Sequence, residues 1–414
     1  MKKSVHGVVS AVAVFAATAA YSEPQAEVLH WWTSGGEAKS VAVLQEEFAA
    51  RGGTWTDMPV AGGGGDAAMT ALRARVLSGN APAAVQLKGP AIQEWYDEGV
   101  LADISNVAEA QGWAEVLPGA IAKHMRCDGQ WCAAPVNVHR VDWIWANAEI
   151  LEANGIEMPA TWEEFNAAAE KLQQAGIIPL AHGGQPWQDA TVFETVVLGI
   201  GGPEFFQRAL VDLDPQALTS DTMVAAFDQM RRLRGFVDGN FSGRDWNLAT
   251  AMVMRGEAGF QIMGDWAKGE FLAAGKVPSK DFLCAPTPGN GFVLNSDSFT
   301  FFKVEGDDKL TGQKVLASLI MSPDFQKTFN LAKGSIPART DVPLDDFDDC
   351  AKLSHSDLLK AIESDSLVPS MAHEMAVPRS VRGEFLDLVT EFFNSDMSSE
   401  DAVKRLADAV KRAM

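Results

Sequence analysis

Short apolar segments alternate with amphipathic helical segments along most of this chain, and this alternation limits the folds open to it. The apolar segments predict strands near residues 27–32, 54–60, 83–87 and 178–182. Helices are predicted at residues 66–78, 161–174, 221–237 and 400–414. The second of these helices opens on Thr161-Trp162-Glu163-Glu164, a capping box that satisfies two backbone N–H groups. Strands that alternate with helices in this way are typical of an α/β fold.

The length of 414 residues exceeds what one hydrophobic core usually serves, so two lobes are expected. The chain has no fixed-period repeat, low-complexity tract or long linker, which favours interleaved lobes over lobes strung in series. The expected crossings between the lobes are at residues 133–147, near 288 and near 342. The predicted N-terminal lobe is 23–136 plus 289–342, and the predicted C-terminal lobe is 137–288 plus 343–414.

The N-terminus predicts export. Lys2 and Lys3 precede an apolar run at residues 8–20 that is too short to span a bilayer. Ala20 and Ser22 suit a cleavage site, so residues 1–22 are predicted to be a secretory signal peptide. With no cysteine near that site, a lipid anchor is not expected, and no later segment resembles a transmembrane helix. The expected location is the periplasm.

The formal net charge of −21 excludes one class of partner. A nucleic-acid-binding surface needs clustered lysine and arginine, so no nucleic-acid partner is expected. Self-repulsion of this acidic chain favours a soluble monomer.

Four cysteines in an oxidising compartment indicate disulfides. Cys127 and Cys132 bracket a turn between two short predicted strands, and residues so placed face each other across a hairpin. Cys284 and Cys350 are then the remaining pair. Metal binding is the alternative, but the chain has no H-E-x-x-H and its seven histidines are scattered. No metal site is expected.

Two adjacent tryptophans, Trp31 and Trp32, stand at the end of the first predicted strand, before a glycine turn and Glu37. Adjacent residues of a strand point to opposite faces, so both rings can be core residues only if both faces are covered. At a strand end, one ring can instead face a cleft. A flat ring beside a carboxylate suits a sugar, because the ring packs on C–H groups while the carboxylate accepts from hydroxyls. These residues alone leave both interpretations open.

The run of four glycines at residues 62–65 precedes Asp66, the expected N-cap of the helix at 66–78. A phosphate-binding P-loop would require a Gly-Lys pair followed by serine or threonine, which is absent here. The spacing of a dinucleotide-binding fingerprint is also absent, so no nucleotide cofactor is expected. The glycines predict a tight backbone at a helix start, with N–H groups that meet either a ligand hydroxyl or solvent.

Eight segments in order give the chain a specific resemblance that spans nearly all of it after residue 22. The segments are residues 31–37 (WWTSGGE), 62–76 (GGGGDAAMTALRARV), 86–89 (QLKG), 135–140 (PVNVHR), 263–266 (MGDW), 295–299 (NSDSF), 333–337 (KGSIP) and 370–373 (SMAH). With these segments, the chain resembles the glucose-binding proteins of bacterial ABC sugar importers, in the extracellular solute-binding family that also includes maltose-binding proteins. Cys132 departs from the pattern, since glycine is usual there.

The resemblance implies an α/β periplasmic binding protein with two interleaved lobes, a hinge and a central cleft. It implies a monosaccharide in that cleft, glucose first and mannose or galactose as alternatives, delivered to the membrane permease subunits of an ABC transporter. The implied sugar-binding residues are Trp31, Trp32, Glu37, Lys88, Trp266, Asp297, Lys333 and His373. Asn137 and His139, on an expected crossing strand, are possible additions. The resemblance implies no enzyme activity, no catalytic residue and no cofactor.

The chemistry of these residue types agrees with a sugar ligand. Carboxylates only accept hydrogen bonds, lysines only donate, and histidine does either, so together they satisfy hydroxyls that both donate and accept. Each residue also has a structural interpretation: Glu37 suits a helix N-terminus and Lys333 a helix C-terminus. The alternative function is an exported glycoside hydrolase with Glu37 and Asp297 as its carboxylate pair. A lysine near each acid argues against it, since the lysine would depress the pKa that a general acid needs.

Overall fold

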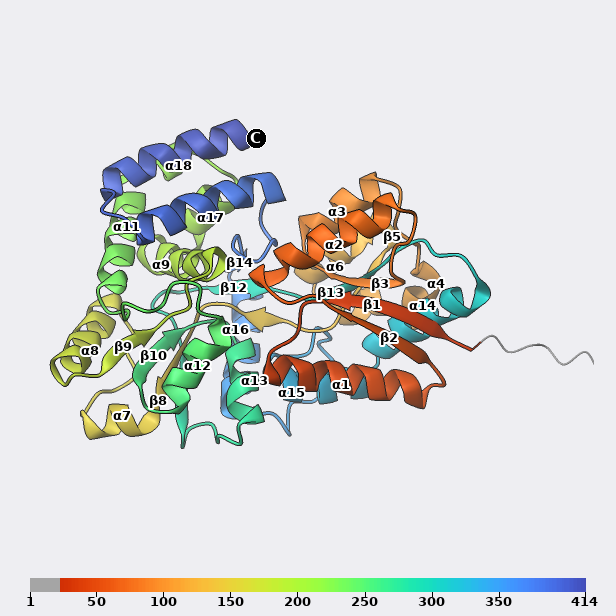
Figure 1. The fold of residues 1–414 in the computed structure, drawn as a ribbon, viewed down its shortest axis with the longest axis horizontal. Helices are drawn as coiled ribbons and strands as arrows, with labels where there is room; N and C mark the ends of the chain where they lie inside the picture. Colours follow the sequence, from red (N-terminus) through yellow and green to blue (C-terminus); the bar gives the residue numbers. More distant parts are fainter. Residues whose placement is uncertain (1–22) are drawn as a thin grey trace, which may run out of the picture.

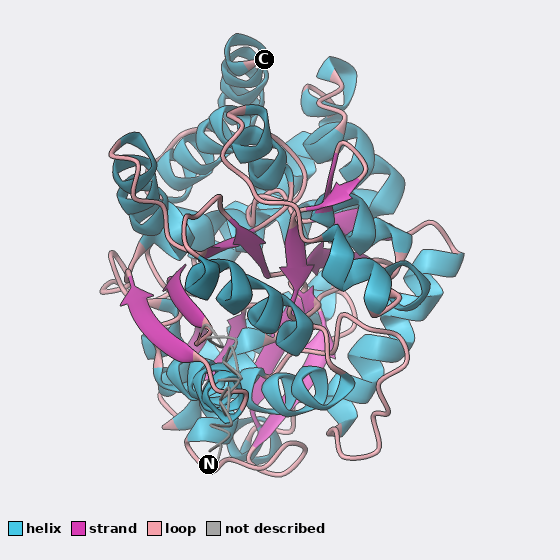
Figure 2. Cartoon of the chain, turned by 90° about the vertical axis from the view of Figure 1, so that its right-hand side faces the viewer, coloured by secondary structure: helices cyan, strands magenta, loops and turns pink. Residues whose placement is uncertain are grey.

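The computed structural model describes residues 23–414, so the predicted signal peptide lies outside the described residues. Two lobes lie side by side in Figure 1, each with its own sheet and its own buried hydrophobic cluster. Helices surround the strands of both lobes (Figure 2). The predicted two-lobe α/β fold is therefore confirmed.

The first lobe is built on a five-stranded sheet in the order β2-β1-β3-β13-β6. β1 is parallel to β2 and β3, whereas β13 is antiparallel to β3 and β6. The strands are β1 (Gln25–His30), β2 (Thr54–Pro59), β3 (Ala84–Leu87), β6 (Ala133–Pro135) and β13 (Ser298–Phe301). Its helices are α1 (Gly35–Ala50), α2 (Asp66–Leu77), α3 (Pro90–Asp97), α4 (Ser105–Ala110), α5 (Trp113–Val116), α6 (Gly119–Met125), α14 (Asp307–Ile320) and α15 (Pro323–Lys333).

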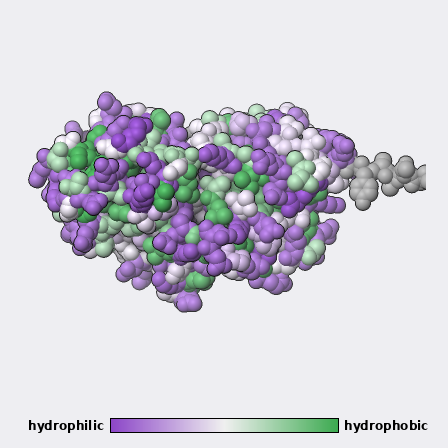
Figure 3. Space-filling view, turned by 90° about the horizontal axis from the view of Figure 1, so that it is seen from below, coloured by the Kyte–Doolittle hydropathy of each residue, from purple (hydrophilic) through white to green (hydrophobic). Residues whose placement is uncertain are grey.

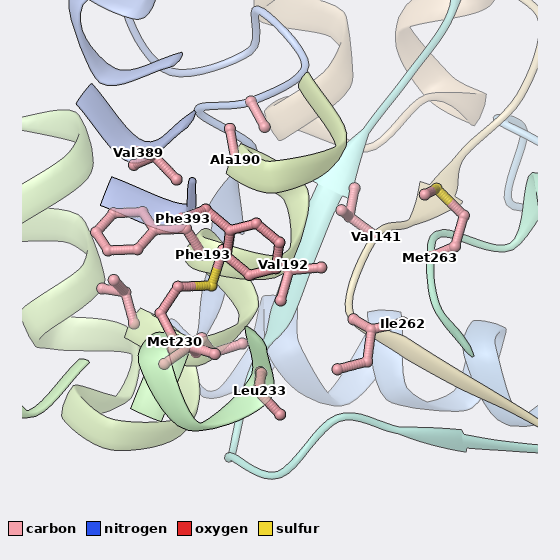
Figure 4. Close-up of a cluster of buried hydrophobic side chains, with 14 of the residues drawn as sticks. Val141, Ala190, Val192, Phe193, Met230, Leu233, Ile262, Met263, Val389 and Phe393 are labelled. Carbon is pink, nitrogen blue, oxygen red and sulfur yellow. The ribbon is translucent and has the colours of Figure 1, made fainter. Parts of the chain in front are cut away.

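The second lobe has a four-stranded sheet in the order β11-β8-β10-β9. The strands are β8 (Trp143–Asn147), β9 (Ile178–Ala181), β10 (Ala258–Ile262) and β11 (Phe282–Pro286). Its helices are α7 (Ala148–Ala153), α8 (Trp162–Gln174), α9 (Pro186–Phe206), α10 (Pro215–Leu218), α11 (Asp221–Arg234), α12 (Trp246–Met254), α13 (Trp266–Ala273), α17 (Arg379–Phe393) and α18 (Ser399–Ala413), with a π-helical turn at Gln207–Val211. Figure 4 shows Phe193, Met230 and Phe393 from three of these helices in one buried cluster.

A small sheet in the order β14-β12-β7 lies between the lobes, where the chain crosses from one to the other. Its strands are β7 (His139–Arg140), β12 (Phe292–Asn295) and β14 (Leu367–Pro369). The helix α16 (Asp349–Glu363) adjoins it and contributes Cys350 to the core of the second lobe and Leu358 to that of the first. Because α16 contributes to both cores, the structure does not assign it to one lobe, and the residue boundaries of the two lobes stay predictions.

Both expected disulfides are present in the structure. Cys127 and Cys132 close the hairpin of β4 (Arg126–Cys127) and β5 (Gln130–Trp131), and Cys284 on β11 is bonded to Cys350 on α16. The second bond joins the sheet of the second lobe to the helix beside the crossing strands.

Two local expectations were wrong. The first strand ends at His30, before the tryptophan pair, because the N–H of Trp31 donates to the side chain of Gln86 (3.1 Å) and the N–H of Trp32 donates to Nδ1 of His30 (3.3 Å). Neither N–H is then free for a strand ladder. Asp66 is the first residue of α2 and not its N-cap; Gly65 is the N-cap, in a left-handed conformation, after a short 3-10 turn at Gly63–Gly65.

The face of the molecule shown in Figure 3 is largely polar. Apolar residues form only small separate patches on the face shown in Figure 3. Within residues 23–414, no helix combines the length and the apolar character needed to cross a membrane.

Candidate ligand-binding cleft

A cavity of about 310 Å³ lies between the two lobes. Its volume is at the small end of the range of about 300–1,000 Å³ for small-molecule sites. Nine of the ten expected site residues line it: Trp31, Trp32, Glu37, Lys88, His139, Trp266, Asp297, Lys333 and His373. Asn137 is buried and does not line it. Among residues 23–414, no cluster of side chains suits a metal ion.

We call the side formed by Trp31, Trp32, Glu37, Lys88, Asp297 and Lys333 the first wall. These residues stand beside the ends of strands β1, β3 and β13 or belong to helices α1 and α15. The second wall consists of Trp187, Trp246, Trp266 and His373, which belong to helix starts and a turn of the second lobe.

Glu37 serves both the helix and the cleft. Its Oε2 accepts from the N–H groups of Thr33 and Ser34, which completes a capping box at the start of α1. Its Oε1 accepts from Lys333 Nζ at 3.2 Å. The structural and the functional interpretation of Glu37 are therefore compatible, since the cap fixes the carboxylate at the edge of the cavity.

The two indoles of the first wall differ in burial. Trp32 is buried against Phe299 and Phe329, with ring centroids 5.7 and 5.5 Å away, so it is largely a core residue. Trp31 is half-buried. Lys88 Nζ lies 5.2 Å from the ring centroid of Trp31, within range of a cation–π interaction. Trp31 therefore offers the cavity more of its face than Trp32 does.

Gly64 and Gly65 bring the glycine loop against the indoles. Both have positive φ, and a Cβ on either would lie 3.2 Å from a tryptophan ring, Trp187 for Gly64 and Trp31 for Gly65. Any larger residue would push the loop off these rings. The four-glycine run therefore allows a close approach of backbone to aromatic faces at the cavity.

Asp297 is the most highly engaged carboxylate of the cleft. Its Oδ1 accepts from Gln86 Nε2 at 3.1 Å, and its Oδ2 lies 3.2 Å from Asn137 Nδ2 and 3.1 Å from His139 Nε2. Lys88 Nζ is 3.9 Å from Oδ1. Asn137 thus lies behind Asp297 and also accepts from its backbone N–H, which makes it a support for the carboxylate.

The charges around Asp297 keep it ionised although it is buried. Burial alone would raise the pKa of Asp297, but His139 and Lys88 outweigh it and hold that pKa well below its usual value. Burial likewise disfavours a charge on His139, but its contacts with Asp265 and Asp297 raise the pKa of the imidazole above its usual value. The base of the cleft is thus a compensated cluster of buried charges.

The second wall is aromatic. Trp266 begins α13, and its ring centroid is 5.2 Å from that of His139 and 5.0 Å from that of His373. The ring centroid of Trp187 lies 5.9 Å from that of His373 and 6.4 Å from that of Trp266, so the three rings form one cluster. Trp266 Nε1 and His373 Nε2 are buried and have no hydrogen-bond partner within residues 23–414. Both residues line the cavity, so the second wall contains two polar atoms that the described part of the chain leaves unpaired.

The sequence analysis missed two tryptophans of the cavity, Trp187 and Trp246. Each stands in the first turn of a helix beside polar residues, in Gln185-Pro186-Trp187 and Asp245-Trp246-Asn247. Gln185 Nε2 donates to Asp245 at 2.6 Å, which joins the two helix starts. The same signal as at Trp31, an indole beside polar groups at a helix start, would have found both.

Hydrogen bonds between the lobes lie beside the cavity, in addition to the close approach of Gly64 to Trp187. The N–H of Gly36 in α1 donates to Glu270 of α13 at 2.7 Å. Asp66 of α2 accepts from Arg379 and Arg382 of α17 at 3.2 and 3.3 Å. The structure therefore has the two walls drawn together around the cavity.

Comparison with known proteins decides the family. A family model described as bacterial extracellular solute-binding protein matches residues 34–310. This chain belongs to that family. A protein of Rhizobium meliloti (strain 1021) named as a probable sugar-binding periplasmic protein is 52% identical over 415 residues, covering 100% of both chains. A protein of the same name from Brucella melitensis biotype 1 is 52% identical over 396 residues, covering 95% of this chain and 94% of the relative.

Solved structures show the same fold. The bacterial solute receptor AcbH superposes with a TM-score of 0.78 over 94% of this chain and 99% of its own, at 17% identity. A chitin oligosaccharide binding protein gives a TM-score of 0.79 over 94% and 98%, at 20% identity. At these identities the likeness concerns the two-lobe architecture.

Proposed function

We propose that this protein is the periplasmic sugar-binding component of an ABC transporter. It binds one monosaccharide in the cleft and presents it to the membrane permease as an exported monomer. The solute-binding family and the two relatives named as probable sugar-binding periplasmic proteins support the transport role. Glucose is the proposed ligand, with mannose and galactose as the nearest alternatives.

The observation that carries this proposal is the composition of the two walls. Indole faces suit the C–H surface of a pyranose, and five tryptophans line one small cavity: Trp31, Trp32, Trp187, Trp246 and Trp266. Between them lie acceptor-only carboxylates and donor-only lysines, which together satisfy hydroxyls that both donate and accept. An apolar ligand would form no hydrogen bond with these groups, and a charged one would upset their balance.

The balance of charge favours a neutral ligand. Glu37 is paired with Lys333 at 3.2 Å, and Asp297 lies 3.9 Å from Lys88. Two acids and two lysines therefore compensate each other in the first wall. A sugar hydroxyl that joins such a pair gains charge-assisted hydrogen bonds, which are roughly twice as strong as neutral ones.

The hydrolase alternative has weaker support. A glycoside hydrolase needs one carboxyl with a raised pKa to protonate the leaving group. Asp297 has the opposite property, because His139 and Lys88 hold its pKa well below the usual value. Glu37 is occupied by the helix cap and by Lys333. Incubation with aryl glucosides and maltose should give no turnover.

Calorimetric titration with monosaccharides, maltose and polyols tests the ligand. We expect a dissociation constant for glucose near or below micromolar, which corresponds to a binding free energy of about −8 kcal/mol. L-glucose serves as the matched control, because it has the same groups in mirror-image positions. Maltose should bind more weakly than glucose, since the cavity is small; a preference for maltose would contradict the monosaccharide assignment.

X-ray scattering tests the transport step. Ligand contacts on both walls favour the closed arrangement of the lobes, and only this arrangement would present both lobe surfaces to the permease. Saturating sugar should therefore reduce the radius of gyration and change tryptophan fluorescence. Superimposable scattering curves with and without sugar would contradict hinge closure even if binding is observed.

A further inference from the structure

Glu194 is a fully buried carboxyl on α9 that lies behind the cleft without lining it. Its Oε2 accepts hydrogen bonds from the backbone N–H groups of Met371 and Ala372, at 2.8 and 3.0 Å. Its Oε1 lies 2.6 Å from the hydroxyl oxygen of Ser370. Glu194 therefore acts on the turn that carries His373 and not on the cavity itself.

Ser370 connects this carboxyl to the imidazole. Its Oγ lies 2.8 Å from Nδ1 of His373 and accepts from the backbone N–H of His373 at 3.0 Å. A serine hydroxyl has one proton, so it donates either to Glu194 or to His373. The far nitrogen of the ring, Nε2, is buried and unpaired within residues 23–414, and His373 lines the cavity. A hydrogen-bonded chain thus runs from a buried carboxyl to the ring that meets the ligand.

We propose that Glu194, acting through Ser370, selects the tautomer of His373 and so decides whether Nε2 donates a hydrogen bond to the ligand or accepts one. Glu194 and Ser370 are then positioning residues, and His373 is the residue that contacts the ligand. The inference rests on the proposed function, because the ligand in question is the sugar.

The position of each proton follows from the donors along the chain. When Glu194 is protonated, its Oε1–H donates to Ser370 Oγ, and the Ser370 hydroxyl donates to Nδ1 of His373. The ring proton is then on Nε2, which is a donor toward the cavity. When Glu194 is ionised, the Ser370 hydroxyl donates to the carboxylate and Nδ1–H donates to Ser370. Nε2 is then an acceptor.

The surroundings of Glu194 favour its protonated form near neutral pH. Burial raises the pKa of Glu194 to about 8, although hydrogen bonds from Ser370 and from the backbone of the turn lower it. The nearby charge of Asp142 raises it further. The first arrangement, with Nε2–H as a donor, is therefore expected at neutral pH.

The imidazole stays neutral in both arrangements. Burial lowers the pKa of His373 well below its usual value, and the charges of Lys88 and Arg382 act in the same direction. His139 also lowers that pKa, while Asp297 opposes the shift. Only the tautomer of His373, and not its charge, is left to vary.

A donor at Nε2 suits the ligand better than an acceptor does. A sugar hydroxyl has one proton, and a hydroxyl that gives it to Glu37 or Asp297 can only accept from its other neighbours. If Nε2 of His373 were also an acceptor, no proton would lie between it and the hydroxyl oxygen of the sugar, and the two atoms could not form a hydrogen bond. The expected loss from that mismatch is about threefold to tenfold in affinity.

NMR of the ring nitrogens of isotope-labelled histidine tests the proposal without any ligand, with His373→Asn to assign the signal. In the wild type, we expect the Nε2–H tautomer about two pH units below 8 and a shift toward Nδ1–H about two units above it. In Glu194→Gln, the amide donates to Ser370 as the protonated acid does, so Nε2–H should persist at both pH values. Ser370→Ala removes the connection, and its tautomer should not follow the wild type.

Calorimetry gives the second readout. We compare how much the affinity for glucose falls between neutral and high pH in the wild type and in Glu194→Gln. The fall in the wild type should be larger than the fall in the variant by about threefold to tenfold. Titration of Lys88, whose pKa burial lowers, is common to both proteins and cancels in this comparison. If Ser370→Ala does not fold, the comparison of wild type with Glu194→Gln still decides the question.

Equal tautomer populations in the wild type and Ser370→Ala at both pH values would overturn the proposal. So would a tautomer change with pH in Glu194→Gln that matches the wild type. Failure of the proposed function is distinguishable from these outcomes. A protein with the expected tautomers that binds no sugar contradicts sugar binding alone, and a sugar-binding protein without them contradicts the role of Glu194 alone.

Discussion

On the first wall of the cleft, both carboxylates lie beside lysines, whereas the second wall presents indole and imidazole nitrogens that have no partner within residues 23–414. The acids and bases of the charged wall are paired without a ligand, Glu37 with Lys333 at 3.2 Å and Asp297 with Lys88 at 3.9 Å. The aromatic wall is incomplete, and an unpaired buried polar group costs about 1–3 kcal/mol.

This difference assigns separate roles to the two walls. If the cleft binds a sugar as proposed, the first wall is already arranged to give it charge-assisted hydrogen bonds. The second wall recovers the cost of its buried nitrogens only when a ligand is present and the lobes are together. Binding of the sugar should therefore stabilise the closed arrangement mainly through the second wall.

The largest expected effect is that of Asp297→Ala, because it leaves Lys88 and His139 without their shared partner. Loss of one member of a buried charge pair costs about 3–5 kcal/mol of unfolding free energy. Sugar affinity should fall tenfold to a hundredfold, at about 1–3 kcal/mol for each unpaired group. Thermal unfolding and calorimetry measure the two effects.

The control for Asp297→Ala is Asp189→Ala. Asp189 is also a buried carboxylate bonded to a histidine, His182, at 2.7 Å, but it does not line the cavity. This variant should lose stability while its affinity stays within about twofold of the wild type. If Asp297→Ala has normal stability and normal affinity, the charged cluster contributes neither to stability nor to sugar binding.

The next effect is a dependence of stability on pH. The pKa of His373 is lowered well below 6.5 in the folded protein, so below that pH the unfolded chain takes up a proton that the folded one does not. Stability should therefore fall as the pH decreases below 6.5, by at most about 1.4 kcal/mol per pH unit from this residue. His373→Asn should flatten the dependence by that amount in denaturant titrations.

His124→Asn is the matched control for this pH effect. Burial lowers the pKa of His124 to about 4, and its Nε2 is likewise unpaired, but it lies on α6 away from the cavity. This variant should also flatten the dependence on pH, yet only His373→Asn should weaken sugar binding. Equal affinities of the two variants would remove His373 from the second wall.

Glu37→Gln separates the helix cap from the ligand role. An amide oxygen still accepts from Thr33 and Ser34, so the cap should persist, but the buried Lys333 loses its charged partner and the free energy of unfolding should fall by about 1–3 kcal/mol. The loss of the charge beside Lys333 should reduce sugar affinity about tenfold, since charge-assisted bonds contribute about 1.5–3 kcal/mol.

Glu164→Gln makes the same change in the other capping box, on α8, where the side chain is exposed and far from the cleft. It should leave the affinity unchanged. A result in which both variants bind sugar normally would mean that Glu37 acts only as a cap.

The smallest expected effect tests the second wall directly. Trp266→Phe keeps an aromatic face but removes Nε1–H, so affinity should fall about threefold to tenfold. Trp143 also has a buried unpaired Nε1 but lies outside the cavity, and Trp143→Phe should bind normally in calorimetry. If Trp266→Phe binds as tightly as the wild type, its indole nitrogen has no role in recognition.

The sequence predicts the first wall better than the second. Trp31, Glu37, Asp297 and Lys333 lie in segments whose order carries the family resemblance. Trp187 and Trp246 also stand beside polar groups at helix starts, but only tertiary structure shows that these two helix starts meet at the cavity. Their position depends on how the second lobe packs.

Local errors have the same cause. The first strand stops at His30 because the Gln86 side chain, 55 residues away, takes the N–H of Trp31. The hairpin disulfide is evident from its five-residue spacing, whereas Cys284 and Cys350 are 66 residues apart and were paired by elimination. For Asn137, the sequence predicts a position near the site, but it does not show that the side chain lies behind Asp297 and supports its carboxylate.

The central claim is that a single monosaccharide contacts both walls of the cleft at once. A crystal structure of the protein with glucose tests it most directly. We predict a pyranose ring against an indole, with hydroxyls within hydrogen-bond distance of Glu37 or Asp297 and of Trp266 Nε1 or His373 Nε2. A sugar that touches only one wall, or that binds outside this cavity, would contradict the account.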